Sequence, residues 1–311
     1  MANRRTLLIG TRGSRLARIQ AETVREMLSS LHPDRAWLLR EIRSEGDVRR
    51  QASLASIGGR GVFVKALEDK LLAGEIDLAV HSLKDMPTRL ATGLKIGAVL
   101  PREDARDALV SRGGSTLDDL PASAVVGSGS ARRRAQLLAY RSDLVVQDVR
   151  GNVDTRLRKL SSGGYDALIL AAAALIRLQR TSAISQWLPL TLMLPAVGQG
   201  ALAVEVRESD EEVRALVQPL NHSPTERAVS AERAFLSTLG GGCTVPVAAY
   251  AAVSDGRLVL QALVANLNGR RVIRDSLSGS PLQAEDIGRR LADRMLSQGA
   301  AHIMREAEGV Q

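Results

Sequence analysis

Aromatic residues are scarce in this 311-residue chain, with two Trp, three Tyr and two Phe making up 2% of it. Hydrophobic residues still make up 45%, so we expect cores built from Ala, Leu, Val and Ile. The scarcity counts against nucleic-acid binding, which usually adds aromatic rings for stacking or a compact basic tract. The net charge of +8 is therefore better explained by a small polyanionic ligand.

Cysteine occurs once, at Cys243, directly after three glycines. A single cysteine excludes an internal disulfide and fits a reducing cytosol. A lone cysteine is usually a small buried hydrophobe. The glycines favour a different interpretation, because they leave room around the sulfur and let the loop change shape. On spacing alone both interpretations stay open.

Several other familiar features are missing. The longest apolar run, residues 167–176, is too short to span a bilayer, and the run near the N-terminus is too short for a secretory signal. The four histidines have no metal-ligand spacing with the cysteine. The chain lacks a G-x-x-x-x-G-K-[ST] loop, a G-x-G-x-x-G motif and a serine nucleophile elbow. We therefore expect a cytoplasmic protein without a membrane span or a metal.

A strand, a loop and a helix follow one another twice along the chain. The first set is a strand over residues 6–9 and a helix from an N-cap at Ser14 to about residue 28. The second is a strand over 124–126 and a helix over 131–140. Each set is followed later by a helix and a buried strand, which predicts two similar α/β lobes with a cleft where the strands end.

The chain crosses between these lobes at residues 101–104 and 195–200, and the strand over 201–206 is expected to return to the first lobe. After Cys243 the apolar period changes to two, which predicts an antiparallel sheet followed by a helix. We expect three domains: residues 1–100 with 200–219, residues 101–199, and a smaller α+β domain over 220–311.

Arginines gather where helices begin. Arg132, Arg133 and Arg134 lie in the first turn of their helix, where the helix dipole disfavours each cation by up to about 1 kcal/mol. A bound anion would compensate, because backbone N–H groups and guanidinium forks both grip carboxylates or phosphates. Any single arginine could be a solvated surface residue. The wider group also includes Arg12, Arg150, Arg156 and Arg177, the last after a region that reads as a strand over 168–176.

Lys84 and Asp85 come just past the end of the buried strand over residues 76–81. Open α/β sheets place functional groups there. The two side chains could form an exposed ion pair. Alternatively, Asp85 faces the cleft, where a carboxylate can accept N–H hydrogen bonds and stabilise a developing cation.

Eight short segments hold most of these residues, in this order along the chain: GTRGSRLA (10–17), GGRGVFVK (58–65), VHSLKDMP (80–87), PREDARDAL (101–109), SARRRAQL (130–137), RGNVDTR (150–156), AVGQGA (196–201) and GGCTVP (241–246). Together they resemble the porphobilinogen deaminase family, also called hydroxymethylbilane synthases. The resemblance implies two lobes like those of a type II periplasmic binding protein, plus the smaller C-terminal domain.

The resemblance also implies an activity in tetrapyrrole biosynthesis. A dipyrromethane cofactor would be held by a thioether to Cys243, and four porphobilinogens would add in turn, each losing ammonia, before water releases hydroxymethylbilane. Asp85, beside Lys84, would bridge pyrrole N–H groups and assist proton transfer, and the loop over residues 44–61 would cover the cleft. The residues that would bind cofactor or substrate are Arg12, Ser14, Ser82, Lys84, Asp85, Ser128, Ser130, Arg132, Arg133, Arg150, Arg156, Arg177 and Gln199. We expect a monomer with no nucleic-acid or membrane partner.

Two alternatives remain at this stage. A non-catalytic, two-lobed anion-binding protein or effector domain would share the lobes and the arginines but would have no use for Cys243. A nucleic-acid binder would explain the pI of 10.3 but not the low aromatic content. The intact mass of the protein separates the three, since only the enzyme carries a covalent dipyrrole.

Overall fold

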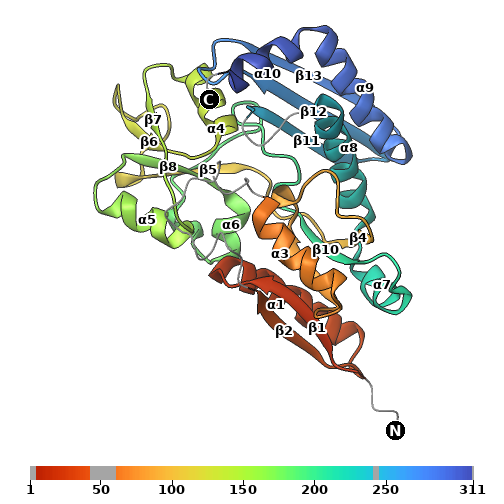
Figure 1. Ribbon diagram of the computed structural model, residues 1–311. Helices are drawn as coiled ribbons and strands as arrows, with labels where there is room; N and C mark the ends of the chain where they lie inside the picture. The colour runs from red at the N-terminus through yellow and green to blue at the C-terminus, as the bar shows by residue number, and fades with distance from the viewer. Residues whose placement is uncertain (1–4, 43–60, 241–244, 310–311) are drawn as a thin grey trace. The chain divides into compact units, whose positions relative to one another are not determined.

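The computed structural model describes residues 5–42, 61–240 and 245–309 of the chain (Figure 1). Cys243 and all but the last residue of the loop expected over 44–61 lie outside the described residues. The chain divides into two compact units, residues 1–102 with 201–226, and residues 103–200 with 227–311. None of the helices within the described ranges combines the length and the apolar character that a membrane crossing needs.

Unit 1 is built on one five-stranded sheet with helices on both faces. Its elements are β1 (Leu7–Arg12), α1 (Arg15–Leu31), β2 (Trp37–Ile42), α3 (Gly61–Leu72), β3 (Leu78–Ser82), β4 (Leu94–Val99), β10 (Leu202–Arg207) and α7 (Glu211–Val217). The strand order is β2-β1-β3-β10-β4, with β1 parallel to β2 and β3, and β10 antiparallel to β3 and β4. The prediction that residues 201–206 return to the first lobe is confirmed.

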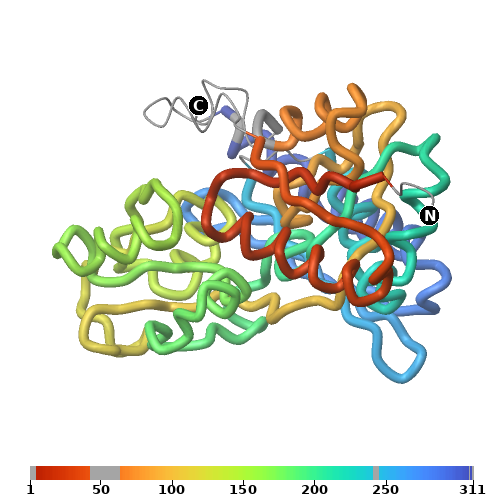
Figure 2. The backbone as a smooth tube through the Cα atoms, turned by 90° about the horizontal axis from the view of Figure 1, so that it is seen from below, coloured from red at the N-terminus to blue at the C-terminus, as the bar shows by residue number. Residues whose placement is uncertain are grey.

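The two faces of this sheet have separate cores. Helix α1 places Val24 and Leu28 against Leu7 and Ile9 of β1, and Figure 2 shows α1 running beside β1 and β2. Helix α3 places its apolar side chains, including Leu67, on the opposite face. As expected from the composition, both cores consist almost entirely of aliphatic side chains.

The sheet of unit 2 repeats this design. Its elements are β5 (Asp107–Ser111), β6 (Val125–Gly127), α4 (Ala131–Tyr140), β7 (Val145–Gln147), α5 (Val153–Ser161), β8 (Ala167–Ala171), α6 (Ala172–Arg177) and β9 (Gln186–Trp187). The order is β7-β6-β8-β5-β9, with β6 parallel to β7 and β8, and β5 antiparallel to β8 and β9. Each strand therefore has a counterpart in unit 1, which confirms the predicted pair of similar lobes.

Two details recur in both sheets. Asp77 precedes β3 and accepts a hydrogen bond from Leu8 N at 2.7 Å, and Asp166 precedes β8 and accepts one from Val125 N at 2.8 Å. Gly10 of β1 also corresponds to Gly127 of β6. A Cβ on Gly10 would lie 2.3 Å from Ile76 Cδ1, and one on Gly127 would lie 2.6 Å from Leu168 Cδ2. The first strand of each lobe therefore requires glycine where a neighbouring side chain covers it.

Serine caps begin the matching helices, as predicted for Ser14 and not predicted for Ser130. Ser14 Oγ accepts from Ala17 N at 3.2 Å, and Ser130 Oγ accepts from Arg133 N at 3.5 Å. The prediction of a strand over residues 168–176 was wrong for its second half. Strand β8 ends at Ala171 and the chain continues as the short helix α6, of which Arg177 is the last residue. The run is apolar throughout, and a short apolar run does not distinguish a buried strand from a buried helix.

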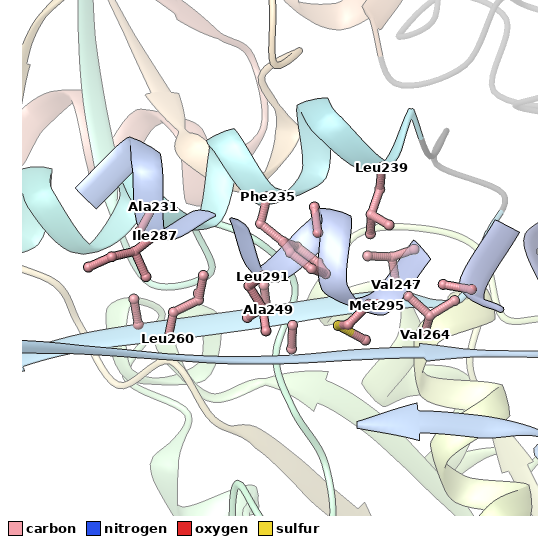
Figure 3. Packing of buried hydrophobic residues seen from close by; sticks show 14 of the residues in the cluster. Ala231, Phe235, Leu239, Val247, Ala249, Leu260, Val264, Ile287, Leu291 and Met295 are labelled. Carbon is pink, nitrogen blue, oxygen red and sulfur yellow. The ribbon is translucent and has the colours of Figure 1, made fainter. Parts of the chain in front are cut away.

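The C-terminal part of unit 2 is a three-stranded antiparallel sheet covered by helices. Its elements are α8 (Ser223–Leu239), β11 (Val247–Ser254), β12 (Arg257–Ala265), β13 (Val272–Gly279), α9 (Ala284–Ser297) and α10 (Ala300–Glu308). Phe235 of α8 lies at the centre of the core that joins the sheet to α8 and α9 (Figure 3). The fold class is thus the one predicted, two α/β lobes and a smaller α+β domain. Strand β4, strands β7 and β9, and helix α10 were not predicted.

Candidate functional site

The predicted site residues of unit 1 lie at one edge of its sheet. Arg12 is the last residue of β1, and Ser82 is the last residue of β3. Ser14 follows β1, and Lys84 and Asp85 lie in the single 3-10 turn η1 (Leu83–Asp85) that follows β3. Because β1 and β3 are parallel neighbours, their carboxyl ends meet, so the structure gathers these five residues. All five are half-buried.

Backbone contacts hold the turn that carries Lys84 and Asp85. Leu83 is 1% exposed, its N–H donates to Ala201 O at 3.0 Å, and Met86 N donates back to Leu83 O at 3.1 Å. Ser82 Oγ lies 2.9 Å from Nε2 of the buried Gln20 on α1. The turn is therefore anchored by Leu83, while the two charged residues beside it keep partial contact with solvent.

A buried group of ionisable side chains, which sequence reasoning missed, lies within the same sheet. His81 Nε2 of β3 is 2.9 Å from Glu205 Oε2 of β10, and both residues are at least nine-tenths buried. Glu68 of α3 is buried beside them. Burial, together with the negative charge of Glu205, raises the pKa of Glu68. The signal available in the sequence was charged residues inside two otherwise apolar strands.

The predicted site residues of unit 2 also follow the carboxyl ends of parallel strands. After β6 come Ser128, Ser130, Arg132 and Arg133, after β7 come Arg150 and Arg156, and after β8 comes Arg177. Strands β7, β6 and β8 are parallel neighbours, so these seven residues share one edge. Arg150 is exposed, Arg156 and Arg177 are half-buried, and Arg132 and Arg133 are buried.

Asp107, the first residue of β5, lies between the two buried arginines. Its Oδ2 accepts from Arg132 Nη1 at 2.8 Å, and its Oδ1 accepts from Arg133 Nη2 at 2.7 Å and from Arg133 Nε at 3.1 Å. Burial alone would raise the pKa of Asp107, but the two guanidinium charges and their hydrogen bonds outweigh it and hold the pKa far below its usual range. Asp107 therefore stays ionised in the interior.

This arrangement changes the explanation for the first-turn arginines. The sequence pattern was interpreted as a helix start that needs a bound anion. The structure supplies an anion from the protein itself, 25 residues from Arg132 along the chain. Arg134, the third member, is exposed and donates to Val146 O at 2.9 Å. Sequence reasoning missed Asp107 because nothing local to residues 130–134 indicates its partner.

Gln199 and Arg177 connect this edge to the second crossing. Gln199 is 1% exposed and donates through Nε2 to Asp107 Oδ1 at 2.9 Å and to Ala105 O at 2.7 Å. Arg177 Nη2 donates to Gly200 O at 2.6 Å. Burial lowers the pKa of the Arg177 guanidinium, although the nearby charge of Glu103 opposes this. The edge of the second sheet thus carries several cations and one buried carboxylate.

A metal centre has no support in the described part of the chain, where no group of three or more His, Cys, Asp or Glu could hold an ion. The chemistry on offer is that of guanidinium groups, hydroxyls, one lysine and one half-buried aspartate. Such a set recognises carboxylates and N–H groups.

Comparison with known families gives two matches. Residues 7–215 match the model described as "Porphobilinogen deaminase, dipyromethane cofactor binding domain", and residues 227–297 match "Porphobilinogen deaminase, C-terminal domain". The chain is 51% identical over 301 residues to porphobilinogen deaminase of Desulforudis audaxviator, covering 97% of both chains. It is 49% identical to that of Geobacillus kaustophilus, covering 96% of this chain and 97% of the relative.

Solved structures similar to part of this chain include a Salmonella typhimurium periplasmic binding protein with high arginine specificity, at 13% identity and a TM-score of 0.41, covering 70% of this chain and 91% of that one. Another is the BenM effector-binding domain with benzoate, at 16% identity and a TM-score of 0.42, covering 69% and 90%. These likenesses are distant and do not bear on function. The family matches and the close relatives span nearly the whole chain, and they show that it belongs to the porphobilinogen deaminase family.

Proposed function

We propose that the reaction of this family runs in the present chain through Cys243, Asp85 and the arginines of the two sheet edges. The reaction is the head-to-tail condensation of four porphobilinogens to hydroxymethylbilane, with release of ammonia, on a dipyrromethane primer. The observation that carries the proposal is the gathering of carboxylate-binding side chains at the carboxyl edge of each sheet, in a chain that matches the dipyrromethane-binding family.

The side chains of these edges fit the cofactor. Every pyrrole ring of the primer and of the growing product carries an acetate and a propionate. Arginine forks suit such groups because a guanidinium can bind a carboxylate bidentately. We assign carboxylate binding to Arg12, Ser14, Ser82 and Lys84 in unit 1 and to Ser128, Ser130, Arg132, Arg133, Arg150, Arg156, Arg177 and Gln199 in unit 2.

Cys243 is the proposed attachment point. It lies outside the described residues, in the stretch between the end of α8 at Leu239 and the start of β11 at Val247. A thiolate is nucleophilic enough to form a thioether with the electrophilic carbon left when an amine departs. When bound, the dipyrromethane supplies the ring carbon to which the first substrate is joined.

Asp85 is the proposed catalytic carboxylate. Its half-buried position in the anchored turn η1 leaves the side chain able to accept hydrogen bonds from pyrrole N–H groups. The same negative charge stabilises the cation that forms on the substrate as ammonia leaves, and the carboxylate can take up or return a proton. Lys84 lies beside it and binds a substrate carboxylate.

Intact mass under denaturing conditions tests the attachment. The wild-type protein is expected to exceed its sequence mass by a covalent dipyrrole, and Cys243→Ser is expected to show the bare polypeptide mass and no turnover. Finding the bare mass in active wild-type protein would refute the cofactor assignment.

Asp85→Asn tests the catalytic carboxylate. Because Asn keeps the shape but loses the charge, we expect the variant to fold and to lose most of its turnover, about 100-fold or more. Asp293→Asn, an exposed residue of α9, is the matched control and should keep wild-type turnover. Near-normal turnover of Asp85→Asn would remove Asp85 from the mechanism.

We also propose that the enzyme acts in the cytoplasm as a monomer, with porphobilinogen as its small-molecule partner. We propose that its three domains are residues 1–100 with 200–219, residues 101–199 and residues 220–311. The absence of a nucleic-acid partner follows from assigning the positive charge to carboxylate binding. Light scattering of the purified protein, with and without porphobilinogen, tests the monomer directly.

A further inference from the structure

Asp107 receives hydrogen bonds from three of the residues assigned to cofactor binding. The carboxylate is 0% exposed. Its Oδ1 accepts from both Arg133 Nε and Nη2 and from Gln199 Nε2, and its Oδ2 accepts from Arg132 Nη1. A carboxylate offers about four lone-pair directions, so these contacts come close to saturating it and leave it little freedom to rotate.

The same guanidinium groups are also fixed from other sides. Arg132 Nη1 donates to Leu194 O at 2.7 Å, and Arg133 Nη1 donates to Ile169 O at 3.0 Å. Leu194 is held in turn by Gln136, which accepts from Leu194 N at 2.7 Å and donates to Leu194 O at 3.0 Å. Strand β8 and the segment before the second crossing therefore hold the same two guanidinium groups of α4 that bind the Asp107 carboxylate.

The first sheet shows that the fold does not require this group. Leu202 is the counterpart of Asp107, because Leu202 pairs with the last residue of β3 as Asp107 pairs with the last residue of β8. Leu16 and Ala17 follow the cap Ser14 as Arg132 and Arg133 follow the cap Ser130. Apolar residues in unit 1 thus occupy the positions that Asp107, Arg132 and Arg133 occupy in unit 2.

We propose that Asp107 is a positioning residue for the carboxylates of cofactor and substrate. By holding Arg132, Arg133 and Gln199 in one arrangement, it fixes the direction from which the two guanidinium groups meet a ligand. Preorganised groups bind more tightly and more selectively than mobile ones, because they lose little conformational freedom on binding. The proposal rests on the function proposed above and adds to it a residue that does not itself touch the ligand.

The central variant is Asp107→Asn, which keeps the shape of the side chain and removes its charge. We expect its KM for porphobilinogen to rise about 10-fold or more, because misplaced binding groups cost that much or more. We also expect a smaller fraction of molecules to carry the dipyrrole in the intact-mass spectrum. Thermal melting and circular dichroism establish that the variant is folded at the assay temperature.

Asp77→Asn is the matched control. Asp77 is 1% exposed and accepts hydrogen bonds from Arg207 Nη2 at 3.5 Å, from Leu8 N and from Arg5. It comes just before β3, at the amino end of the strand, whereas the predicted site residues of unit 1 lie at the carboxyl edge of that sheet. It should lower the melting temperature while leaving dipyrrole loading and KM unchanged. If Asp107→Asn behaves like Asp77→Asn, with full loading and a KM within twofold of wild type, Asp107 is only a structural ion-pair partner and the proposal is wrong.

Two further variants keep the test decisive should Asp107→Asn not fold. Asp107→Glu retains the charge but moves the carboxylate by one methylene, so a positioning role predicts a raised KM with folding preserved. Gln199→Leu removes the hydrogen bonds from Nε2 to Asp107 Oδ1 and to Ala105 O but no charge, and we expect a rise in KM of about threefold. Wild-type KM in both folded variants would overturn the proposal. Failure of the proposed function is a separate result, because wild-type protein would then lack the dipyrrole altogether.

Discussion

The two five-stranded sheets have corresponding strand orders and pairing, yet each buries a different group of ionisable side chains. The first holds Glu68, His81 and Glu205 against the face that α3 covers. The second holds Asp107 with Arg132 and Arg133 at its carboxyl edge. Each group is absent from the other sheet, since the register places Leu170 and Val110 where His81 and Glu205 stand.

The difference shows what decides the state of a buried carboxyl. Burial by itself would raise the pKa of both Glu68 and Asp107. The neighbours act in opposite directions. Glu205 adds to the effect of burial on Glu68, whereas two guanidinium groups reverse it for Asp107, so one pKa ends raised and the other lowered. Topology provides the position, and the side chains around that position determine the charge.

The largest expected effect comes from placing a carboxylate in the first sheet without its arginines. Leu202→Asp would put a charge at the counterpart of Asp107, among the aliphatic side chains that include Val204 and Leu100. An unpaired buried charge costs about 3 to 5 kcal/mol, so we expect the free energy of unfolding to fall by that amount. Urea denaturation at pH 7, followed by circular dichroism, measures it.

Leu202→Asn is the control for this substitution, because it has the same shape without the charge. We expect it to lose less stability than Leu202→Asp at pH 7, and the gap to close in acid as the introduced carboxyl takes up a proton. Equal stability of the two variants at pH 7 would mean that this position tolerates a charge without arginine partners, and the contrast between the sheets would lose its physical basis.

A smaller effect is expected where the two sheets are alike. Gly10→Ala and Gly127→Ala each place a methyl group against a neighbouring side chain, 2.3 Å from Ile76 Cδ1 and 2.6 Å from Leu168 Cδ2. Overpacking of this kind costs about 1 to 3 kcal/mol, and we expect both variants to fall in that range by thermal or urea unfolding.

Rescue variants sharpen this comparison. Ile76→Val removes the atom nearest the new methyl group in unit 1 and should restore much of the loss in Gly10→Ala. Leu168→Val should rescue Gly127→Ala less completely, because Tyr165 Cδ1 also lies 2.9 Å from the new Cβ. Rescue of equal size in both lobes would show that Tyr165 moves aside without cost.

Features with a local cause could be predicted from the sequence. The cap Ser14, the helix over 131–140 and the alternating strands after residue 245 depend on neighbours a few residues away, and the structure has them as predicted. Asp107 could not be predicted, because its partners come from α4 and the second crossing and meet it only in the folded sheet. Helix α6 was missed because an apolar run has no period that separates helix from strand. The role proposed for Cys243 came from the family resemblance and not from its surroundings.

The smallest expected effect is that of substituting Glu68. The direction in which this effect on stability changes with pH is the sharpest test of the difference between the two sheets. The pKa of Glu68 is raised in the folded state, so the folded protein holds this proton more tightly than the unfolded chain does. Stability is unaffected below the unfolded pKa and falls as the pH rises from there through the folded pKa. Glu68→Gln removes this loss. We therefore expect the substitution to raise the free energy of unfolding by on the order of 1 kcal/mol at pH 7 and to leave it unchanged near pH 4.

Asp107 must show the opposite dependence if the neighbours decide the charge. Its folded pKa is lowered, so its contribution is present in full above the unfolded pKa, about 3.9, and is lost as the pH falls toward the folded pKa. Asp107→Asn should therefore be less stable than wild type at pH 7, and the difference should shrink in acid. Unfolding curves of both variants between pH 3 and pH 8 measure the two slopes together. Slopes of the same sign would mean that burial, and not the arginines, determines the pKa of Asp107.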